Sequence, residues 1–554
     1  MGNDGMTHAV SNVVNELKDV NLYETDAVLR AAVTREGAGW HHTALSHYGA
    51  LMGSEATIRE GEEANRDTPR LEAFDRVGHR VDRVHFHPAW HSLMAKFRAQ
   101  GLIAQPYADT RPGSWVAFAG GFFLHGQIES GSQCPSTMTQ ASIAVLRNEP
   151  GLFGPLRDKL FATTYDASDR PWFDKASVYI GMGMTEKQGG SDVRTNTTRA
   201  VARGASGRGQ TYELTGHKWF FSAPMCDAHL VLARTEGADA RGGLSCFFMP
   251  RWRADGSKNP VHIQRLKAKV GNVSNSSSEV EFHGAEAIMV GEEGRGVPTI
   301  IEMANITRLH CVVGGAGQVR QALAQALNYT RQRTAFGRLL VDQPLMRSVL
   351  ADMALESEAA TVLAMRLAAA FDQPDDPLQA AWRRLLTPAA KFWVCKRAVE
   401  LAGEAMEVFG GNGYVAGGPM ARLFVDVPVN SIWEGSGNVM CLDVLRALSR
   451  DPEAAQRLLA DVMRRSGEDA RLRPAIQALL TDLQRPPEAL EAIARRFVQR
   501  LVLVTQAALL VESAPQVVAD AFIASRFDAE WGRVFGGLPP EVQPDAILSR
   551  IWSA

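Results

Sequence analysis

The sequence predicts an α+β fold that is mainly helical, with one β domain between helical domains. Helical periodicity dominates from about residue 20 to 180 and again from Val297, whereas short β-type segments fill the stretch between. At 554 residues the chain is too long for a single hydrophobic core. We therefore expect four domains: an N-terminal helical domain (1–180), a middle β domain (181–296), a helical bundle (297–450) and a C-terminal helical domain (451–554).

The composition is ordinary for a soluble protein, with 45% hydrophobic and 22% charged residues and a formal net charge of -2. This balance gives no overall bias toward nucleic acid or an anionic membrane. The six cysteines are scattered and form no C-x-x-C pair, which favours a reducing cytoplasm over a disulfide framework. The strongest apolar run, Leu501 to Val511, is too short to span a bilayer and predicts a buried helix, so we expect no membrane attachment.

Within the N-terminal domain, three histidines gather in His85-Phe-His-Pro-Ala-Trp-His91. Pro88 disrupts a helical ligand face, and no Cys, Asp or Glu within the cluster completes a site. We interpret these histidines as part of an initial turn and the first turn of a helix, and expect no metal.

The middle domain alternates segments of strand composition with turns that contain Gly, Asp or Asn. The clearest segments are Tyr212-Glu-Leu-Thr, Ala228-His-Leu-Val-Leu-Ala, Leu244-Ser-Cys-Phe-Phe-Met and Glu279-Val-Glu-Phe. Their spacing favours a compact sheet or barrel over a parallel βαβ array. Because no G-x-G-x-x-G follows a strand and opens a helix, a Rossmann fold is disfavoured.

Long helical segments resume at Val297, with breaks such as Gln373–Pro377 and Gly410–Tyr414, and their length suits a helical bundle. The part after about residue 450 contains 12 Arg and 14 Asp plus Glu, but neither Lys nor His. This change of composition indicates a separate helical module.

A glycine-rich loop lies where helix gives way to strand, Met182-Gly-Met-Thr-Glu-Lys-Gln-Gly-Gly-Ser-Asp192. Its accessible backbone N–H groups and short hydroxyl donors suit a polar heterocycle or a phosphate. The same composition fits a plain turn between two elements, and the loop alone does not separate the two interpretations.

A second motif, Asn430-Ser-Ile-Trp-Glu-Gly-Ser-Gly-Asn438, lies in a break between helices. Glu434 follows the large apolar Trp433, and a partly dry pocket would raise the pKa of its carboxyl toward the range of a proton acceptor near neutral pH. An equally good interpretation from this motif alone is a capping carboxylate at a helix start.

Together the two motifs resemble loops of the acyl-CoA dehydrogenase family. Thr185-Glu186 followed by Gly190-Ser191-Asp192 is similar to the family's T-E-P-x-A-G-S-D loop, and Trp433-Glu434-Gly435-Ser436 to its Y-E-G-T segment. Three more matches keep the family's order: Gly216-His-Lys-Trp-Phe-Phe-Ser222, Arg333-Thr-Ala-Phe-Gly337 and Gly410-Gly-Asn-Gly-Tyr414. The segment Val33-Thr-Arg-Glu-Gly-Ala-Gly-Trp40 and the additional C-terminal domain resemble the branch of this family known from the bacterial adaptive response to DNA alkylation.

The resemblance implies the acyl-CoA dehydrogenase fold, FAD as cofactor and a homotetramer. The backbone at Met184 and Thr185 would contact the isoalloxazine ring, Ser191 would lie where substrate and flavin meet, and Ser222 would lie beside flavin N5. Arg333 resembles the arginine that reaches the FAD pyrophosphate of a neighbouring subunit. The cofactor-binding residues implied in this way are Met182, Met184, Thr185, Ser191, Phe220, Phe221, Ser222, Arg333, Phe336, Gly410, Gly411, Trp433, Ser436 and Asn438.

The same resemblance assigns Glu434 as the catalytic base toward an acyl-CoA-like small molecule. In the family, hydrogen bonds polarise the thioester carbonyl while a glutamate removes the α-proton and the β-hydride passes to flavin N5. The sequence departs from the family pattern at Lys187, Phe220, Glu407 and Val425. These changes keep the backbone positions expected to contact FAD and alter the surroundings on which fatty acyl-CoA turnover depends.

The adaptive-response branch binds double-stranded DNA, so the resemblance also implies DNA as a partner of the C-terminal domain. That domain carries a net charge of -2 (12 − 14), so phosphate contacts would depend on local arginines. The candidates are Arg446, Arg450, Arg464, Arg465, Arg471, Arg473, Arg495, Arg496 and Arg500. They fit equally well on solvated helix faces, paired with Glu468, Asp469, Glu488 and Glu491.

The sequence and its family resemblance therefore leave three alternative functions. The first is an FAD protein with acyl-CoA dehydrogenase chemistry and a role in protecting or repairing DNA under alkylation stress. The second is a catabolic acyl-CoA dehydrogenase without a DNA role, and the third is a DNA-binding protein with a non-catalytic flavin. The additional C-terminal domain argues against the second, and the complete Glu434 motif argues against the third.

Overall fold

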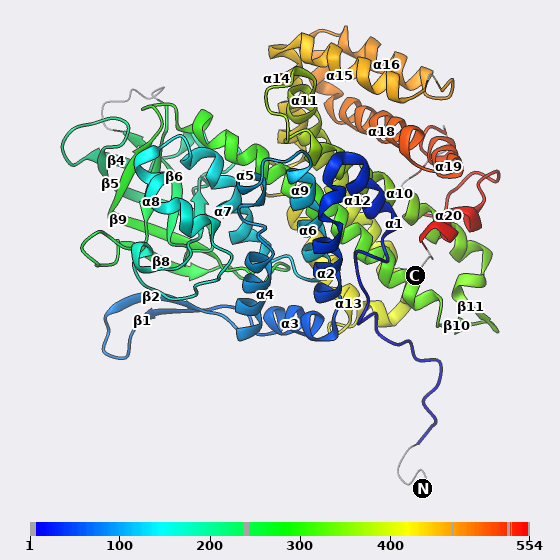
Figure 1. The fold of residues 1–554 in the computed structure, drawn as a ribbon, viewed down its shortest axis with the longest axis horizontal. Coiled ribbons are helices and arrows are strands. Elements are labelled where there is room, and N and C mark those ends of the chain that lie inside the picture. Colours follow the sequence, from blue (N-terminus) through cyan, green and yellow to red (C-terminus); the bar gives the residue numbers. More distant parts are fainter. Residues whose placement is uncertain (1–6, 236–242, 468, 529–531, 533, 552–554) are drawn as a thin grey trace.

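The computed structural model describes residues 7–235, 243–467, 469–528, 532 and 534–551. In Figure 1 the sheet domain forms one end of the molecule, helices fill the centre, and the C-terminal helices lie above them. This arrangement confirms the mainly helical α+β fold.

The N-terminal domain consists of short and medium helices with one β-hairpin. Its elements are α1 (Ala27–Val33), α2 (His42–Met52), α3 (Glu55–Arg66), β1 (Arg70–Phe74), β2 (Arg80–His85), α4 (Pro88–Ala99), α5 (Gln105–Ala108), α6 (Ser114–Ile128), α7 (Gln133–Leu146) and α8 (Pro150–Phe161). The hairpin was not predicted. Its cross-strand pair Leu71 and Val84 packs on the interior of the middle sheet, a contact that local sequence does not reveal.

The middle domain is a seven-stranded sheet. Its strands are β3 (Ile180–Gly183), β4 (Arg199–Ala202), β5 (Thr211–Ser222), β6 (Ala228–Thr235), β7 (Ser245–Pro250), β8 (Val261–Leu266) and β9 (Ser277–Val290). Because β6 pairs with both β4 and β7, the strands β6, β4, β5, β9 and β7 close into a barrel, with β3 and β8 attached to β6 and β9. The barrel interior is apolar, and Phe221, Phe247 and Phe282 are buried there. The predicted β region is confirmed.

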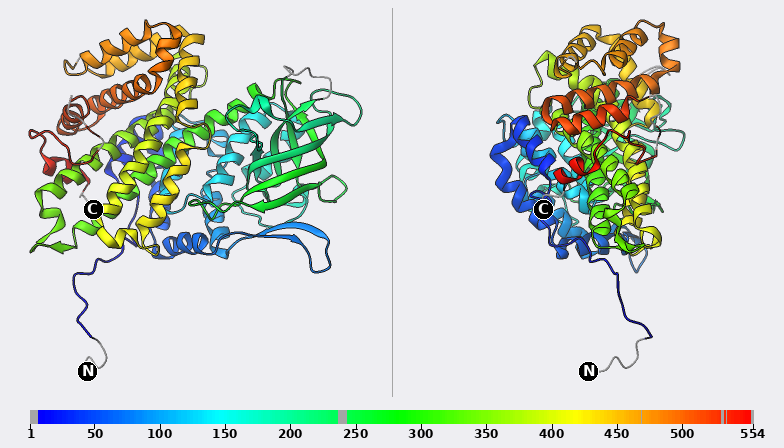
Figure 2. Two further views of the ribbon diagram at one scale, coloured as in Figure 1. Left: turned by 180° about the vertical axis from the view of Figure 1, so that it is seen from behind. Right: turned by 90° about the vertical axis from the view of Figure 1, so that its right-hand side faces the viewer.

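The central bundle is built around the 35-residue helix α9 (Gly296–Thr330), which packs against α6, α7, α10 and α12. Its other elements are β10 (Thr334–Ala335), β11 (Arg338–Leu339), α10 (Pro344–Ala369), α11 (Pro377–Ala381), α12 (Thr387–Val408), α13 (Pro419–Asp426) and α14 (Gly437–Arg450). The left view of Figure 2 shows these helices beside the sheet domain and below the C-terminal helices.

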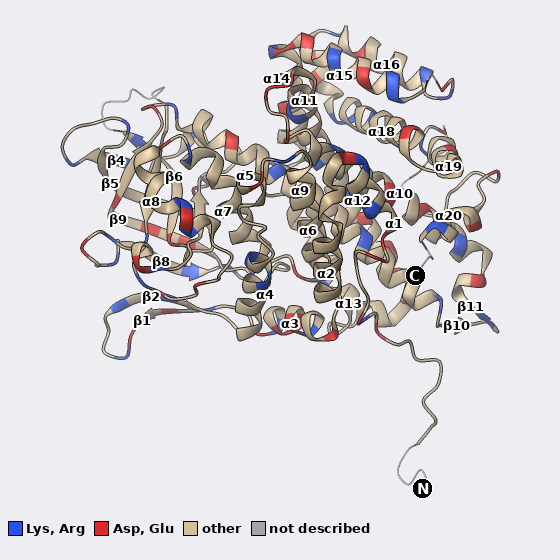
Figure 3. Cartoon of the chain, viewed as in Figure 1, with Lys and Arg blue, Asp and Glu red and all other residues tan. Residues whose placement is uncertain are grey.

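The C-terminal domain is helical, and its elements are α15 (Pro452–Arg465), α16 (Arg473–Leu483), α17 (Pro487–Ala492), α18 (Ala494–Ser513), α19 (Gln516–Arg526) and α20 (Pro544–Ile551). The run Leu501 to Val511 lies in α18, and most of it is buried, as predicted. Figure 3 shows both signs of charge interspersed over these helices. Within the described ranges, no helix has the length and apolarity needed to cross a membrane.

Candidate active site

A buried thiol at the start of α7, that of Cys134, lies within electrostatic reach of the end of β5 and of the loop before α14. Burial raises the pKa of Cys134 to about 11, and Lys269, Ser222, Glu434 and Asn275 also act on that pKa. These side chains come from segments far apart in the sequence, so the fold brings the residue expected beside flavin N5 and the expected base into one region.

The glycine-rich loop is anchored by a fully buried ion pair. Lys218 Nζ lies 2.9 Å from Glu186 Oε1, and both side chains have no exposed surface. Burial raises the pKa of Glu186, but Lys218 and hydrogen bonds from Thr197 and Thr198 lower it to about 2. Burial lowers the pKa of Lys218 to about 8, against the effect of Glu186. The loop is therefore a turn with a rigid base, next to half-buried Met182, Met184 and Thr185 and exposed Ser191.

The end of β5 places neighbouring side chains on opposite faces of the barrel. Phe220 is 53% exposed, and the Ser222 hydroxyl lies 3.5 Å from that of Ser277 on β9. Phe221 instead stacks on His229 inside the barrel, with ring centroids 4.0 Å apart. A cofactor on the outer face could meet Phe220 and Ser222 through their side chains, but Phe221 only through its backbone. The family resemblance alone does not make this distinction.

Glu434 occupies a tight turn in an unusual backbone conformation, with φ of 60°. Two cations hold the three carbonyls of this turn. Arg308 Nε donates to Glu434 O at 3.0 Å, while Lys391 Nζ donates to Trp433 O at 2.6 Å and to Gly435 O. A left-handed conformation of a residue with a Cβ costs on the order of 1–3 kcal/mol, so it persists only where surrounding contacts impose it.

The Glu434 carboxylate points to α9, where the Thr307 hydroxyl donates to its Oε2 at 2.5 Å. Burial raises the pKa of Glu434, while the Thr307 hydrogen bond and the charges of Arg308 and Lys391 lower it in part. The helix-capping interpretation is wrong, because α14 begins at Gly437 and its N-cap, Ser436, makes no side-chain capping bond. The geometry instead gives a desolvated carboxylate with a single hydroxyl donor.

The residues around Glu434 are fixed by hydrogen bonds. Trp433 Nε1 donates to Asn430 Oδ1 at 2.9 Å, and Asn430 Nδ2 donates to Gln318 Oε1 at 2.9 Å. On the exposed side, Arg495 of α18 donates to Asn438 Oδ1 at 2.9 Å. The C-terminal domain thus contacts the first turn of α14, directly after the loop that carries Glu434, a link that the sequence did not signal.

The remaining candidate cofactor-binding residues lie at the surface of the bundle, and they are distant from the Glu434 turn in the sequence. The Arg333 guanidinium donates to Asn12 O, and Phe336 is 97% exposed. A Cβ at Gly410 or Gly411 would meet nothing within 4 Å among the described atoms. Phe336, Gly410 and Gly411 are therefore open to a second molecule, whereas Arg333 is half-buried and bonded within the chain.

The residues present fit a flavin. Asn275, which is 2% exposed, has both side-chain polar atoms buried without a hydrogen-bond partner in the described part of the chain. An unpaired buried amide costs roughly 1–3 kcal/mol, so a polar ligand that satisfies it gains by that amount. Exposed Phe220 adds an aromatic face at the end of β5.

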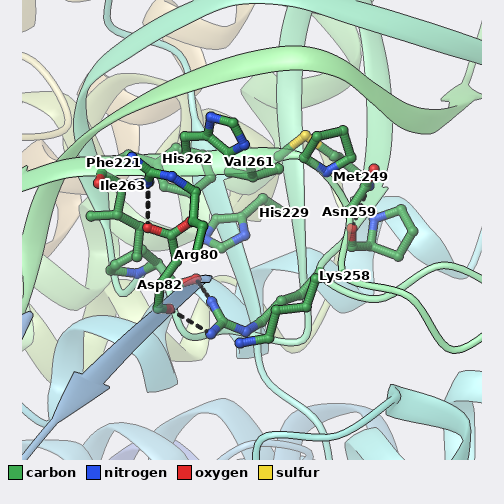
Figure 4. A pocket seen from close by; sticks show the side chains of 14 residues that line it. Arg80, Asp82, Phe221, His229, Met249, Lys258, Asn259, Val261, His262 and Ile263 are labelled. Atoms are coloured by element: carbon green, nitrogen blue, oxygen red, sulfur yellow. Dashed lines mark hydrogen bonds and ion pairs between the residues drawn. The ribbon is translucent and has the colours of Figure 1, made fainter. Parts of the chain in front are cut away.

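Two cavities lie away from the Glu434 turn. One, of about 180 Å³, opens at the end of the barrel, where Figure 4 shows Arg80 and Asp82 of the hairpin facing His229 and Lys258. The other, of about 320 Å³, lies between α4, the loop 165–169 and the turn after β5.

The histidine cluster has structural partners. His85 ends β2 and bonds Glu72 at 2.7 Å, His87 caps α4, and His91 bonds the Tyr165 hydroxyl at 2.8 Å. The predicted initial turn and first helical turn are confirmed for His87 and His91, whereas His85 belongs to the unpredicted hairpin. Among the residues that the structure describes, no cluster of His, Cys, Asp or Glu could hold a metal ion.

Five of the nine candidate DNA-contacting arginines are engaged within the chain. Arg464 and Arg465 pair with Asp461, Arg471 with Asp469 and Asp520, Arg500 with Asp482, and Arg495 bonds Asn438. Of the expected carboxylate partners only Asp469 forms such a pair in the described chain, and Glu468 lies outside the described residues. The other four are exposed and have no ion pair within the described ranges: Arg446, Arg450, Arg473 and Arg496.

Comparison with known families covers most of the chain. Residues 12–167 match the "Adaptive response protein AidB N-terminal domain", residues 181–285 the "Acyl-CoA dehydrogenase, middle domain" and residues 294–449 the "Acyl-CoA dehydrogenase, C-terminal domain".

Individual proteins are similar over nearly the full length. The chain is 43% identical over 546 residues to the putative acyl-CoA dehydrogenase AidB of Escherichia coli K12, covering 98% of each chain. It is 30% identical to acyl-CoA dehydrogenase family member 11 of Caenorhabditis elegans, over 88% of this chain and 82% of that one. The crystal structure of C. elegans ACDH-11 in complex with C11-CoA superposes with a TM-score of 0.86 at 27% identity, covering 96% of both chains.

Proposed function

This chain belongs to the acyl-CoA dehydrogenase family and is an FAD-dependent oxidoreductase of that type, and we propose that Glu434 is its catalytic base. The observation that carries this proposal is the buried Glu434 carboxylate, which lies in a left-handed turn and accepts a hydrogen bond from the Thr307 hydroxyl. A carboxylate with a raised pKa is a stronger proton acceptor than a free one.

The chain's own residues perform the proton step. Lys391 and Arg308 fix the turn, Thr307 fixes the carboxylate, and ionised Glu434 takes the α-proton of the bound acyl thioester. Bound FAD supplies the acceptor for the substrate hydride. Burial of the carboxylate also excludes water that would otherwise compete for the base.

The residues proposed to hold FAD fall into two groups. Met182, Met184, Thr185, Ser191, Phe220, Ser222, Trp433, Ser436 and Asn438 would surround the isoalloxazine side, with Phe221 contributing backbone only. Arg333, Phe336, Gly410 and Gly411 would meet the cofactor of another subunit. The exposure of Phe336 (97%), Leu345 (84%) and Tyr414 (83%) supports a subunit interface there, and we propose a homotetramer.

The substrate we propose is an acyl-CoA, since ACDH-11, a similar protein, was solved with C11-CoA. We further propose a cytoplasmic location, supported by six cysteines that are all free and buried.

We propose double-stranded DNA as a second partner, in line with the AidB-like N-terminal domain. Four exposed arginines that form no ion pair with the described residues support it: Arg446, Arg450, Arg473 and Arg496. They lie on α14, α16 and α18, helices of which α18 packs against both others. An arginine without a carboxylate partner can contact a phosphate without first breaking an ion pair.

An anaerobic titration tests the enzymatic proposal. The FAD-loaded protein is mixed with short-, branched- and long-chain acyl-CoAs while the flavin absorption band is followed. We expect at least one acyl-CoA to bleach the flavin, and the Glu434→Gln variant to retain FAD but bleach at least a hundredfold more slowly. A flavin that stays oxidised with every acyl-CoA would favour a non-catalytic flavin instead.

A further inference from the structure

The chain before α1 forms an arm, here called the N-terminal arm and defined as residues 7–20, which is drawn in dark blue in Figure 1. The base of this arm is anchored to the helices beside it. Val20 N donates to Gly53 O at 3.3 Å, and Lys18 pairs with Glu55 at 2.9 Å. The arm therefore leaves the body of the protein from a fixed point.

Closer to the N-terminus, the backbone of Asn15 is bonded to two side chains at the end of α9 and directly after it. Asn15 N accepts no side chain but donates to Gln332 Oε1 at 3.0 Å, and Asn328 Nδ2 donates to Asn15 O at 2.9 Å. Gln332 Nε2 donates to the same carbonyl at 3.3 Å. Gln332, the residue directly before Arg333, is thus held by both backbone polar groups of one arm residue.

Asn12 holds the residue directly after Arg333. Its Nδ2 donates to Thr334 O at 2.9 Å, and its Oδ1 accepts from Thr334 N at 2.8 Å. The Thr334 hydroxyl donates to the same oxygen at 2.9 Å. Asn12 has φ of 55°, a left-handed conformation that asparagine adopts more readily than most residues with a Cβ. One side-chain amide therefore bonds both backbone polar groups of Thr334.

The Arg333 side chain itself is bonded to the same part of the arm. Its guanidinium donates to Asn12 O, and it forms no ion pair with any residue that the structure describes. A neutral carbonyl orients the guanidinium without cancelling its charge. Since the guanidinium carries several N–H donors in a fixed fork, donors remain for an anion. Arg333 is therefore oriented by the arm and keeps its charge for a phosphate.

We propose that the N-terminal arm positions Arg333 and thereby sets the affinity of the protein for FAD. The residue before Arg333, the residue after it and its own guanidinium all bond to the arm, so the arginine is held before the cofactor binds. A side chain that is already fixed loses less conformational freedom on binding than one that is free. This inference rests on the proposed contact between Arg333 and FAD.

Two substitutions release Arg333 from the arm without changing the arginine. Asn12→Gly removes the side-chain bonds to Thr334, and glycine adopts the positive φ of this position without strain. Gln332→Met keeps a side chain of similar length but loses the bonds to Asn15. Because the two variants break different bonds, agreement between them excludes an effect peculiar to one substitution.

Titration of the full-length apoprotein with FAD tests the proposal, with the dissociation constant taken from the change in flavin fluorescence. We expect Asn12→Gly and Gln332→Met to bind FAD about three- to tenfold more weakly than the parent, the range for one hydrogen bond. Asp19→Gly is the matched control. Asp19 lies on the same arm and also has φ of 55°, but its carboxylate accepts from Glu55 N at 2.9 Å, so the affinity should not change.

A double variant separates positioning of Arg333 from general support of the loop. Arg333→Met is expected to weaken FAD binding about ten- to hundredfold, the range for a charge-assisted hydrogen bond. Adding Asn12→Gly to Arg333→Met should cause no further loss, because the arm acts through that arginine. If the arm only supported the loop, Asn12→Gly would weaken binding by the same factor with and without Arg333. Flavin bleaching by FAD-saturated Asn12→Gly should match the parent rate, since Glu434 is unchanged.

The inference is overturned if Asn12→Gly and Gln332→Met both bind FAD as the parent does, or if the full Asn12→Gly loss persists beside Arg333→Met. It is also overturned if the loss of affinity accompanies dissociation of the oligomer in light scattering, because the arm would then act on assembly. Parent-like affinity in Arg333→Met would instead refute the proposed contact between Arg333 and FAD, so the two failures are distinguishable.

Discussion

The Thr307 hydroxyl lies 2.5 Å from Oε2 of Glu434 and 3.0 Å from the carbonyl oxygen of Ala304, so one proton faces two acceptors. When Glu434 is ionised, the Thr307 proton goes to the carboxylate. When Glu434 is protonated, the carboxyl donates to Thr307, which then donates to Ala304. Thr307 can therefore serve both states of the base, and it stabilises the ionised one.

The first prediction concerns the pH dependence of flavin reduction. Burial raises the pKa of Glu434, and the base must be ionised to act. The rate of flavin reduction should therefore rise with pH, and the midpoint of this rising limb should lie above the pH at which a free carboxyl titrates. The Thr307 bond lowers this pKa, so Thr307→Val should move the limb to higher pH. At neutral pH it should slow bleaching about three- to tenfold. Thr307→Ser keeps the hydroxyl and should follow the parent profile, and superimposable profiles for all three proteins would refute this role.

Lys391 provides the second prediction. Its ammonium holds the carbonyls on both sides of Glu434, so Lys391→Met should release the left-handed turn. The left-handed conformation of Glu434 costs about 1–3 kcal/mol, and without the clamp this cost must be met to bring the base into place. Single-turnover bleaching should therefore be roughly 5- to 150-fold slower. FAD content should not change. Lys396→Met, on the same helix, is the control, and an equal loss in both variants would mean that the clamp is not specific.

The third prediction concerns the base of the glycine-rich loop. Lys218→Met leaves the Glu186 carboxylate buried without its cation, which should cost about 3–5 kcal/mol and lower the midpoint of thermal unfolding. The double variant Glu186→Gln/Lys218→Met removes both charges and should recover part of that loss. A single variant as stable as the parent would contradict the burial of this pair.

The fourth prediction separates paired from unpaired arginines in DNA binding. Replacing Arg446, Arg450, Arg473 and Arg496 by Gln should weaken binding to duplex DNA and flatten its salt dependence, by a slope of about 0.9 for each phosphate that is no longer neutralised. The matched variant replaces Arg464, Arg465, Arg471 and Arg500, which hold carboxylates. It should change the affinity less. Equal affinity and salt slope for the first variant and the parent would argue against these four as DNA-binding residues.

Much of the fold could be predicted because the periodic signals are local. The β segments at Ala228 and Glu279 and the buried helix at Leu501 fall where their patterns place them. The β1–β2 hairpin could not be predicted, since Leu71 and Val84 are stabilised by the distant sheet rather than by their neighbours in sequence.

The site was predictable in part. The motif around Glu434 is visible in the sequence, but the choice between base and helix cap depended on Thr307, 127 residues earlier in the chain. The clamp by Arg308 and Lys391 and the hydrogen bond from Arg495 to Asn438 likewise join segments that no local pattern connects. The orientation of Phe221, by contrast, follows from a local pattern. Strand alternation alone places its side chain on the opposite face from those of Phe220 and Ser222.

The central claim, that Glu434 removes the α-proton of a bound acyl thioester, is tested most directly by hydrogen exchange. The FAD-loaded protein is incubated anaerobically in D2O with an acyl-CoA that it oxidises slowly, and deuterium at the α-carbon is measured by mass spectrometry. We predict exchange that depends on the protein and falls at least a hundredfold in Glu434→Gln while FAD stays bound. Undiminished exchange in that variant would contradict the account.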